Sequence, residues 1–189
     1  MVSYIKKNKL LSTFILLTFI SFVFGILFYA LLDASSKNTV SENIVLLFDN
    51  KLIDMKTFFF NSLFSNALIW ILGISIIGFV VVLSLYLFKV FIFAFEFISL
   101  IININSKNFL MVLGYLFPNL LSTSILFILS YYSVSYSVFL FRYLFRGGNY
   151  NLPFITKKYI RVLILSFLFM LGSCVLEYFI LKHISILKF

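Results

Sequence analysis

Long apolar runs separated by short polar segments occupy most of this chain. The first run extends from Leu10 to Leu32 and follows lysines at positions 6, 7 and 9. As a helix it would span about 35 Å, enough to cross the hydrocarbon core of a bilayer, which is about 30 Å thick. It exceeds the apolar region of a cleaved signal peptide, so we expect a retained membrane helix. The whole pattern predicts five spans, at 10–32, 66–88, 90–105, 109–141 and 160–181.

Two of these predicted spans have unusual lengths. The third apolar run, interrupted only by Glu96, is short for a crossing, whereas the fourth would make a helix of about 50 Å. Pro118 lies inside the fourth run, and proline removes a backbone hydrogen bond and clashes with the preceding turn. We therefore expect the fourth helix to kink or break at Pro118. A re-entrant segment over 108–118 is the alternative, since irregular backbone at membrane depth is tolerated where protein or water satisfies it.

One sizeable polar segment precedes the second span. Within residues 40–57, apolar side chains recur at helical spacing and charged side chains take the other face, a pattern typical of an amphipathic helix on the outer surface. Such a helix lies in the headgroup region of a membrane or offers a face to a partner protein. The candidate docking face comprises Ile44, Phe48, Leu52 and Met55.

Composition indicates the same class of protein. Hydrophobic residues make up 63% of the 189 residues and charged residues 11%, whereas a soluble domain is about half apolar and about a quarter charged. We therefore expect a single integral membrane domain over residues 1–189, folded as an all-α, polytopic transmembrane helical bundle. The net charge of +9 comes from basic residues between the apolar runs, and this distribution argues against nucleic-acid binding.

The basic residues also predict an orientation in the membrane. Five crossings place the basic cluster within 142–161 on the same side as the N-terminal lysines and Lys89. Six crossings would move that cluster or the C-terminal tail across. Because cytoplasmic loops are rich in lysine and arginine, five crossings are favoured, with the N-terminus in the cytoplasm and the C-terminus outside the cell membrane.

The sequence offers little catalytic or cofactor chemistry. His183 is the single histidine and Cys174 the single cysteine, so neither a zinc site nor an internal disulfide is expected. We predict no enzyme activity, no metal and no cofactor. Glu96 and Glu177 lie within apolar runs, where acidic side chains usually face the bundle interior or a wet cavity. They predict either structural carboxyl groups or, as the alternative function, a proton or cation path in a small transporter or channel component.

The stretch IWILGISIIG, residues 69–78, holds small residues inside the second predicted span. Gly73 and Gly78 would point about 140° apart on a helix, and Ser75 would share a side with Gly78. Small residues allow backbones to approach closely, which is a main source of helix association in lipid. We expect this helix to sit between two neighbours at the centre of the bundle. The predicted packing residues are Trp70, Gly73, Ser75 and Gly78.

Residues 70–78, with the sequence WILGISIIG, resemble the signature of the stage II sporulation protein M family. These are small multi-pass membrane proteins of endospore-forming bacteria. Lys89 after the motif, Pro118 in the fourth apolar run and Glu177 near the end extend the resemblance over roughly residues 60–180. The family's glycines after the lysine are absent here, and Ala94 is the small residue left for close packing of the third helix.

The resemblance implies a non-enzymatic scaffold of the engulfment machinery in the mother-cell or septal membrane during sporulation. Its expected partners are the lipid bilayer and two cell-wall hydrolases, a lytic transglycosylase and an amidase, which it would recruit for peptidoglycan remodelling. Self-association is left open. The positions to which the resemblance gives structural roles are Gly73, Gly78, Pro118 and Glu177, and Asn119 stands beside the proline.

Overall fold

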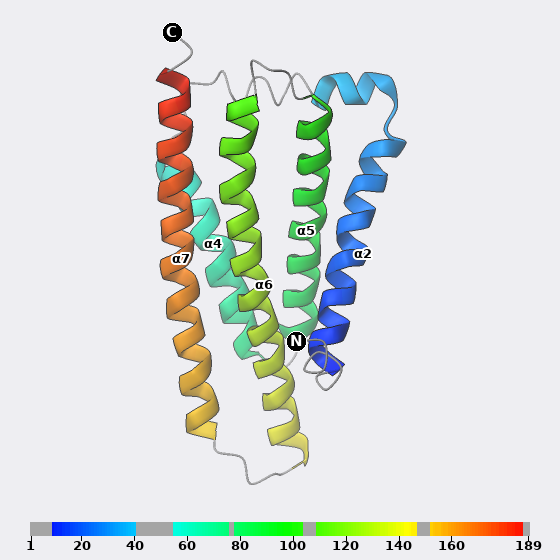
Figure 1. The fold of residues 1–189 in the computed structure, drawn as a ribbon. Coiled ribbons are helices and arrows are strands. Elements are labelled where there is room, and N and C mark those ends of the chain that lie inside the picture. The colour runs from blue at the N-terminus through cyan, green and yellow to red at the C-terminus, as the bar shows by residue number, and fades with distance from the viewer. Residues whose placement is uncertain (1–8, 41–54, 76–77, 104–108, 147–151, 187–189) are drawn as a thin grey trace.

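The computed structural model of the chain is almost entirely helical over the part that it describes, residues 9–40, 55–75, 78–103, 109–146 and 152–186. A short helix covers 34–40, and nearly all other described residues belong to five long helices (Figure 1). They are α2 (Lys9–Leu31), α4 (Met55–Ile74), α5 (Gly78–Ile102), α6 (Phe109–Arg146) and α7 (Leu152–Ile186). No strand occurs among the described residues, in agreement with the predicted all-α fold.

Four of these helices are long and apolar enough to cross a membrane, which is the architecture of a multi-pass membrane protein. The qualifying segments are Lys9–Leu31, Gly78–Ile102, Val112–Phe145 and Leu152–Ile180. The fifth long helix, α4, is not among these segments, and most side chains of its first half lie outside the described residues. The multi-pass helical architecture is therefore confirmed for four helices of the described part, and the number of five spans stays a prediction.

The central helix of the bundle is α6, which packs against each of the other four long helices. At one edge, α2 packs mainly along α5 (Figure 1). At the other edge, α7 packs on α6 and α4. From the sequence we predicted that the helix containing residues 69–78 lies at the centre of the bundle. This prediction was wrong, because α6 occupies the centre.

The two ends of the bundle differ in charge. α2 begins at the end where α6 finishes and α7 begins, and the α6–α7 hairpin projects beyond the start of α2 (Figure 1). Five exposed basic residues mark this end, which we call the basic end: Lys9, Arg142, Lys157, Lys158 and Arg161. Both hairpin helices extend past the predicted spans 109–141 and 160–181, because helix-compatible apolar residues continue between the basic ones.

The second and third predicted spans have different boundaries in the structure. The prediction of one helix over 66–88 was wrong, because α4 ends at Ile74 and α5 begins at Gly78. The span expected over 90–105 is the second half of α5, which runs through Lys89 without interruption. The Lys89 side chain is exposed. An exposed lysine keeps its backbone hydrogen bonds and lays its aliphatic stem along apolar surface, so it does not end a helix.

Pro118 lies inside α6 without breaking it. The break expected there has to be corrected, as does the re-entrant alternative, because residues 109–118 are continuous with the rest of α6. The proline ring is fully buried, and the side-chain amide of Asn119 donates a hydrogen bond to the Tyr115 carbonyl at 3.2 Å. Packing and side-chain bonds of this kind let helices in membranes tolerate proline.

Most of the predicted amphipathic segment, 40–57, lies outside the described residues. Of its candidate docking residues, Ile44, Phe48 and Leu52 fall in the undescribed part, and Met55 is the first residue of α4. The docking face therefore stays a prediction from the sequence.

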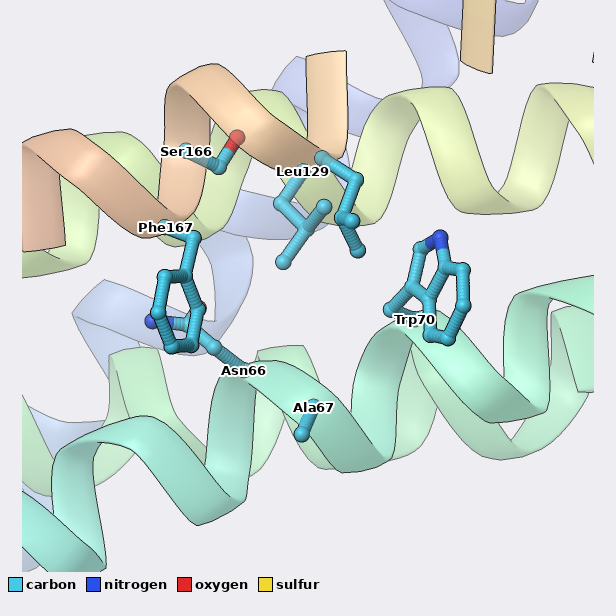
Figure 2. A pocket seen from close by; sticks show the side chains of 7 residues that line it. Asn66, Ala67, Trp70, Leu129, Ser166 and Phe167 are labelled. Atoms are coloured by element: carbon cyan, nitrogen blue, oxygen red, sulfur yellow. The ribbon is translucent and has the colours of Figure 1, made fainter. Parts of the chain in front are cut away.

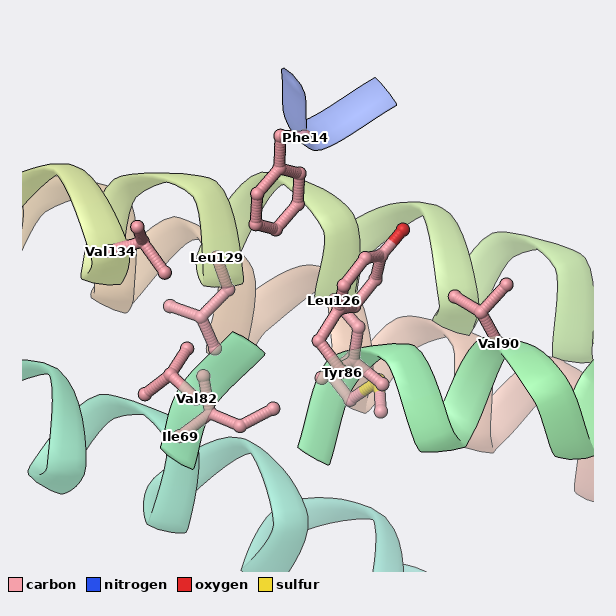
Figure 3. Packing of buried hydrophobic residues seen from close by; sticks show 9 residues of the cluster. Phe14, Ile69, Val82, Tyr86, Val90, Leu126, Leu129 and Val134 are labelled. Carbon is pink, nitrogen blue, oxygen red and sulfur yellow. The ribbon is translucent and has the colours of Figure 1, made fainter. Parts of the chain in front are cut away.

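An apolar core lies between the five long helices, and each of them contributes to it (Figure 3). Its buried members are Phe14, Ile69, Val82, Tyr86, Val90, Leu126, Leu129, Val134 and Met170. The Tyr86 ring stacks on that of Phe14, with centroids 5.0 Å apart, and the Tyr86 hydroxyl lies 3.2 Å from that of Thr18. These contacts fasten α2 to the rest of the bundle.

α2 and α5 approach each other closely at Gly25. A Cβ atom built on Gly25 would lie 2.5 Å from the Phe91 carbonyl oxygen and 2.8 Å from Ala94 Cβ. One turn earlier on α2, the Ser21 hydroxyl donates to the Leu87 carbonyl at 2.6 Å. The α5 helix therefore packs closely through Ala94, without the glycines that the resemblance would lead one to expect at this point.

Candidate functional site

The stretch IWILGISIIG, residues 69–78, connects α4 to α5. α4 ends at Ile74, and the chain has reversed direction where α5 begins at Gly78 (Figure 1). At the end of α4, the Leu72 carbonyl accepts hydrogen bonds from the Ser75 backbone N–H at 3.1 Å and from its hydroxyl at 2.9 Å. The Gly78 N–H then donates to the Ser75 carbonyl at 3.1 Å. We call residues 70–78 the α4–α5 junction.

Both glycines of the α4–α5 junction stand where a side chain would collide. A Cβ atom on Gly73 would lie 2.7 Å from Ser133 Cβ on α6 and would also meet the Tyr159 hydroxyl on α7. A Cβ atom on Gly78 would meet the Leu72 carbonyl group. The two glycines therefore lie on different helices, Gly73 on α4 and Gly78 on α5. The sequence pattern had predicted them on two sides of a single helix. Gly73 lets α4 end against two neighbours, and Gly78 lets the chain turn tightly on itself.

Hydroxyl groups from α6 and α7 bind the backbone of the junction. The Ser137 hydroxyl donates to the Ser75 carbonyl at 2.6 Å, and the Tyr159 hydroxyl donates to the Trp70 carbonyl at 3.0 Å. The Ser133 hydroxyl lies 3.0 Å from the Tyr159 oxygen. Helix ends leave carbonyl groups without an intrahelical partner, and buried carbonyl groups need partners from elsewhere in the protein. These side chains supply partners for the place where the helix stops.

Tyr159 ties the junction to both α6 and α7. It is 3% exposed, and its ring stacks on Tyr136 with centroids 4.4 Å apart and planes 2° apart. The stacked pair fixes the position of the hydroxyl that reaches α4. The Tyr159 side chain therefore combines aromatic packing with a specific hydrogen bond.

We expect Tyr159→Phe to lower the thermal unfolding midpoint of the purified protein in detergent. The substitution keeps the ring but removes the hydrogen bonds to the Trp70 carbonyl and to Ser133. Leaving a buried partner unsatisfied costs about 1–3 kcal/mol. Tyr143→Phe, at a half-buried position on α6, is the matched control and should leave the midpoint unchanged. Equal midpoints for Tyr159→Phe and the unmodified protein would contradict this account of the junction.

A small pocket lies beside the junction, between α4, α6 and α7 (Figure 2). Its volume is about 200 Å³, and Asn66 and Trp70, one turn apart on α4, line it together with Leu129 and Ser166 from the facing helices. Asn66 is 3% exposed. Among the described residues, neither amide atom of Asn66 has a hydrogen-bond partner, and the indole nitrogen of Trp70 has none either.

The lining of this pocket limits what it can bind. No charged side chain is among its lining residues, so an ion would have no partner of opposite charge. A water molecule occupies about 30 Å³ and needs two to four polar partners. Asn66, Trp70 and Ser166 provide polar groups of this kind in the lining. The pocket suits ordered water or a small neutral polar group. In the described ranges, no group of three His, Cys, Asp or Glu side chains could hold a metal ion.

The other predicted site residues lie away from the junction. Glu96 is half-buried on α5, and the Tyr115 hydroxyl of α6 donates to its carboxylate at 3.5 Å. Glu177 belongs to α7, but its side chain falls outside the described part. Pro118 and Asn119 lie about 20–30 Å along α6 from the serines that contact the junction, at a rise of about 1.5 Å per residue. The structure therefore brings Trp70, Gly73, Ser75 and Gly78 together and leaves the remaining candidates apart.

Sequence reasoning missed the side chains of α6 that receive the junction. Ser130, Ser133 and Ser137 are each 0% exposed, and on α7 Ser166 and Ser173 are also buried. Small residues at spacings of three and four are a signal for close helix packing in membranes. The repeat of serines at 130, 133 and 137 is the feature of the sequence that could have identified this surface.

Comparison with known proteins finds no matching family model, no matching curated protein and no matching solved structure. The resemblance of residues 70–78 to the stage II sporulation protein M family therefore stays a prediction from the sequence. The geometry of the junction gives these residues a physical role that does not depend on the family.

Proposed function

We propose that this protein is a non-enzymatic membrane scaffold that positions partner proteins at the bilayer. The observation that carries the proposal is the apolar core to which all five long helices contribute (Figure 3). Val82, Tyr86, Leu126 and Leu129 are each at most 1% exposed within it. Transport sites use convergent polar groups or a wet cavity near the membrane centre. Closely packed apolar side chains at the centre of the described bundle favour a static role.

The more specific form of the proposal is a scaffold of the engulfment machinery. It rests on the resemblance of residues 70–78 to the stage II sporulation protein M family. In this role the protein lies in the mother-cell or septal membrane, with the basic end in the cytoplasm, as the distribution of lysine and arginine favours. It recruits a lytic transglycosylase and an amidase, and the docking face predicted within 40–57 meets them on the outer side.

Affinity purification of the tagged full chain from sporulating cells tests this proposal. We expect a lytic transglycosylase and an amidase to co-purify with the membrane-extracted protein. The combined substitution of Ile44, Phe48 and Leu52 by serine should reduce their recovery severalfold, while the amount of inserted protein stays the same. Lys37→Ala, a substitution at a partly exposed position between the end of α2 and the docking face, is the control and should leave recovery unchanged. Purification without either hydrolase would contradict the engulfment role.

Transport through Glu96 and Glu177 is the competing function, and a flux measurement separates it from the scaffold. In proteoliposomes, the scaffold predicts no pH-driven cation flux above that of empty liposomes. Glu96→Gln and Glu177→Gln should then change nothing in this assay, and co-purification of partners should survive both. A flux that either substitution abolishes would contradict the scaffold and assign transport instead.

A further inference from the structure

A second and larger pocket lies at the basic end, between the start of α2, the latter part of α6 and the start of α7. Its volume is about 530 Å³. Its walls are rich in tyrosine and include one lysine; the members that matter here are Tyr131, Tyr132, Tyr136, Tyr159, Lys158 and Leu11. Aromatic rings with polar tips thus surround a space that is open to the surroundings of the bundle.

The position of this pocket corresponds to the boundary of the membrane. Leu11 in its wall belongs to the first turn of α2, where the long apolar run begins, and exposed Lys9 comes just before that run. Tyrosine is enriched at membrane–water interfaces, where the ring lies in the apolar layer and the hydroxyl meets the headgroups. A group in this pocket therefore lies at headgroup depth.

The charge around the pocket is positive. Lys158 lines it, and Lys157 and Arg161 are exposed on the same stretch of α7. The sequence has no acidic residue within 1–32 or 97–176, so none of the three chain segments that form the pocket offers a carboxylate. The Lys158 ammonium lies 5.7 Å from the centroid of the Tyr132 ring. A fixed cation without an acidic neighbour favours an anionic occupant.

The wall between α6 and α7 is already formed. The Tyr136 and Tyr159 rings stack in parallel, and the Tyr136 hydroxyl lies 2.9 Å from that of Thr156. Both tyrosines are at most 7% exposed. The pocket therefore does not have to be assembled by its ligand, which lowers the conformational cost of binding.

We propose that this pocket binds the phosphate-bearing headgroup of an anionic phospholipid, with Lys158 as the charged contact. Basic pockets between membrane helices are known to hold such headgroups, because an ammonium binds phosphate strongly where water is scarce. The site differs in place and in chemistry from the Asn66–Trp70 pocket, and it goes beyond the scaffold function.

The test uses the full chain in nanodiscs that contain equal amounts of phosphatidylglycerol and phosphatidylcholine. Native mass spectrometry of the released protein counts the lipids that stay bound. We expect phosphatidylglycerol to be retained preferentially by the unmodified chain and by Lys158→Arg, which keeps the charge. Lys158→Gln should reduce its retention about fivefold, while phosphatidylcholine is unaffected. Lys158 is exposed, so this change should not disturb folding, as elution in size exclusion will verify.

Lys37→Gln is the matched control, because the Lys37 ammonium also lies beside a tyrosine ring, 5.8 Å from the centroid of Tyr29, at the opposite end of the bundle. It should leave retention unchanged. Two outcomes would overturn the proposed site: an equal loss of phosphatidylglycerol retention in the two lysine variants, or no preference for phosphatidylglycerol in the unmodified chain. Either would show only a general attraction of anionic lipid to the protein surface. Competition by inorganic phosphate that depends on Lys158 would assign the pocket to a soluble phosphate and overturn the lipid assignment. Absence of such competition supports it.

Discussion

Replacing Gly73 with leucine is expected to remove most of the folded protein from membranes. The first added carbon alone would lie 2.7 Å from Ser133 Cβ and would meet the Tyr159 hydroxyl. Both neighbours are buried and hydrogen-bonded to each other, so neither can move without breaking the contacts that hold α4. Overpacking costs about 1–3 kcal/mol or more, and the lost hydrogen bonds add about 1–3 kcal/mol. This is a large share of a typical stability of about 5–15 kcal/mol.

The amount of monodisperse protein extracted from membranes, followed by fluorescence-detected size exclusion, measures this effect. Gly172→Leu is the matched control, because Gly172 is also a glycine within a long helix and a Cβ atom there would meet nothing within 4 Å. Its yield should equal that of the unmodified chain. Normal yield for Gly73→Leu would show that α4 does not end against α6 and α7 in the way described.

Replacing Gly25 with leucine is expected to have an effect of similar size at the other side of the bundle. A side chain there would meet the Phe91 carbonyl oxygen at 2.5 Å, Ala94 Cβ at 2.8 Å and the Phe95 backbone nitrogen at 3.2 Å. Two of these atoms belong to the α5 backbone and cannot rotate away, so α2 itself has to move. The stacking of Phe14 on Tyr86 and the Ser21 hydrogen bond would be lost with it.

The same extraction assay, combined with protease sensitivity of α2, measures the outcome for Gly25. Gly25→Ala should lower the yield less than Gly25→Leu, because one methyl group requires a smaller displacement. The two substitutions together therefore form a series in side-chain size. A yield for Gly25→Leu as high as that for Gly172→Leu would be incompatible with close packing of α2 on α5.

Much of the fold could be predicted from the pattern of apolar residues. The first span was placed within a residue of its observed bounds, because Lys9 and Asp33 end the apolar run at both sides. The boundaries near Lys89 and Pro118 were misplaced for a common reason. Lysine and proline were interpreted as local interruptions, whereas burial of Pro118 and exposure of the Lys89 side chain let both stay within long helices.

The candidate site was predictable in part. The glycines of residues 69–78 indicated close backbone approach, which the positions of Gly73 and Gly78 now explain. That the helix ends between them could not be read from periodicity, because the residues on both sides are equally apolar. The ending depends on hydroxyls from Ser137 and Tyr159, which lie more than sixty residues further along the chain. Tertiary contacts of this range carry no local sequence signal.

The most direct test of the α4–α5 junction is a cross-link between Ser75→Cys and Ser137→Cys in a chain whose single native cysteine, Cys174, is replaced by serine. The Ser137 hydroxyl lies 2.6 Å from the Ser75 carbonyl oxygen, so a short bifunctional maleimide should join the two cysteines in native membranes. Ser84→Cys, at an exposed position on α5, should form no link with Ser137→Cys. Efficient linking of the first pair alone is the predicted result. Failure of that pair to link, with each cysteine separately reactive toward maleimide, would contradict the junction.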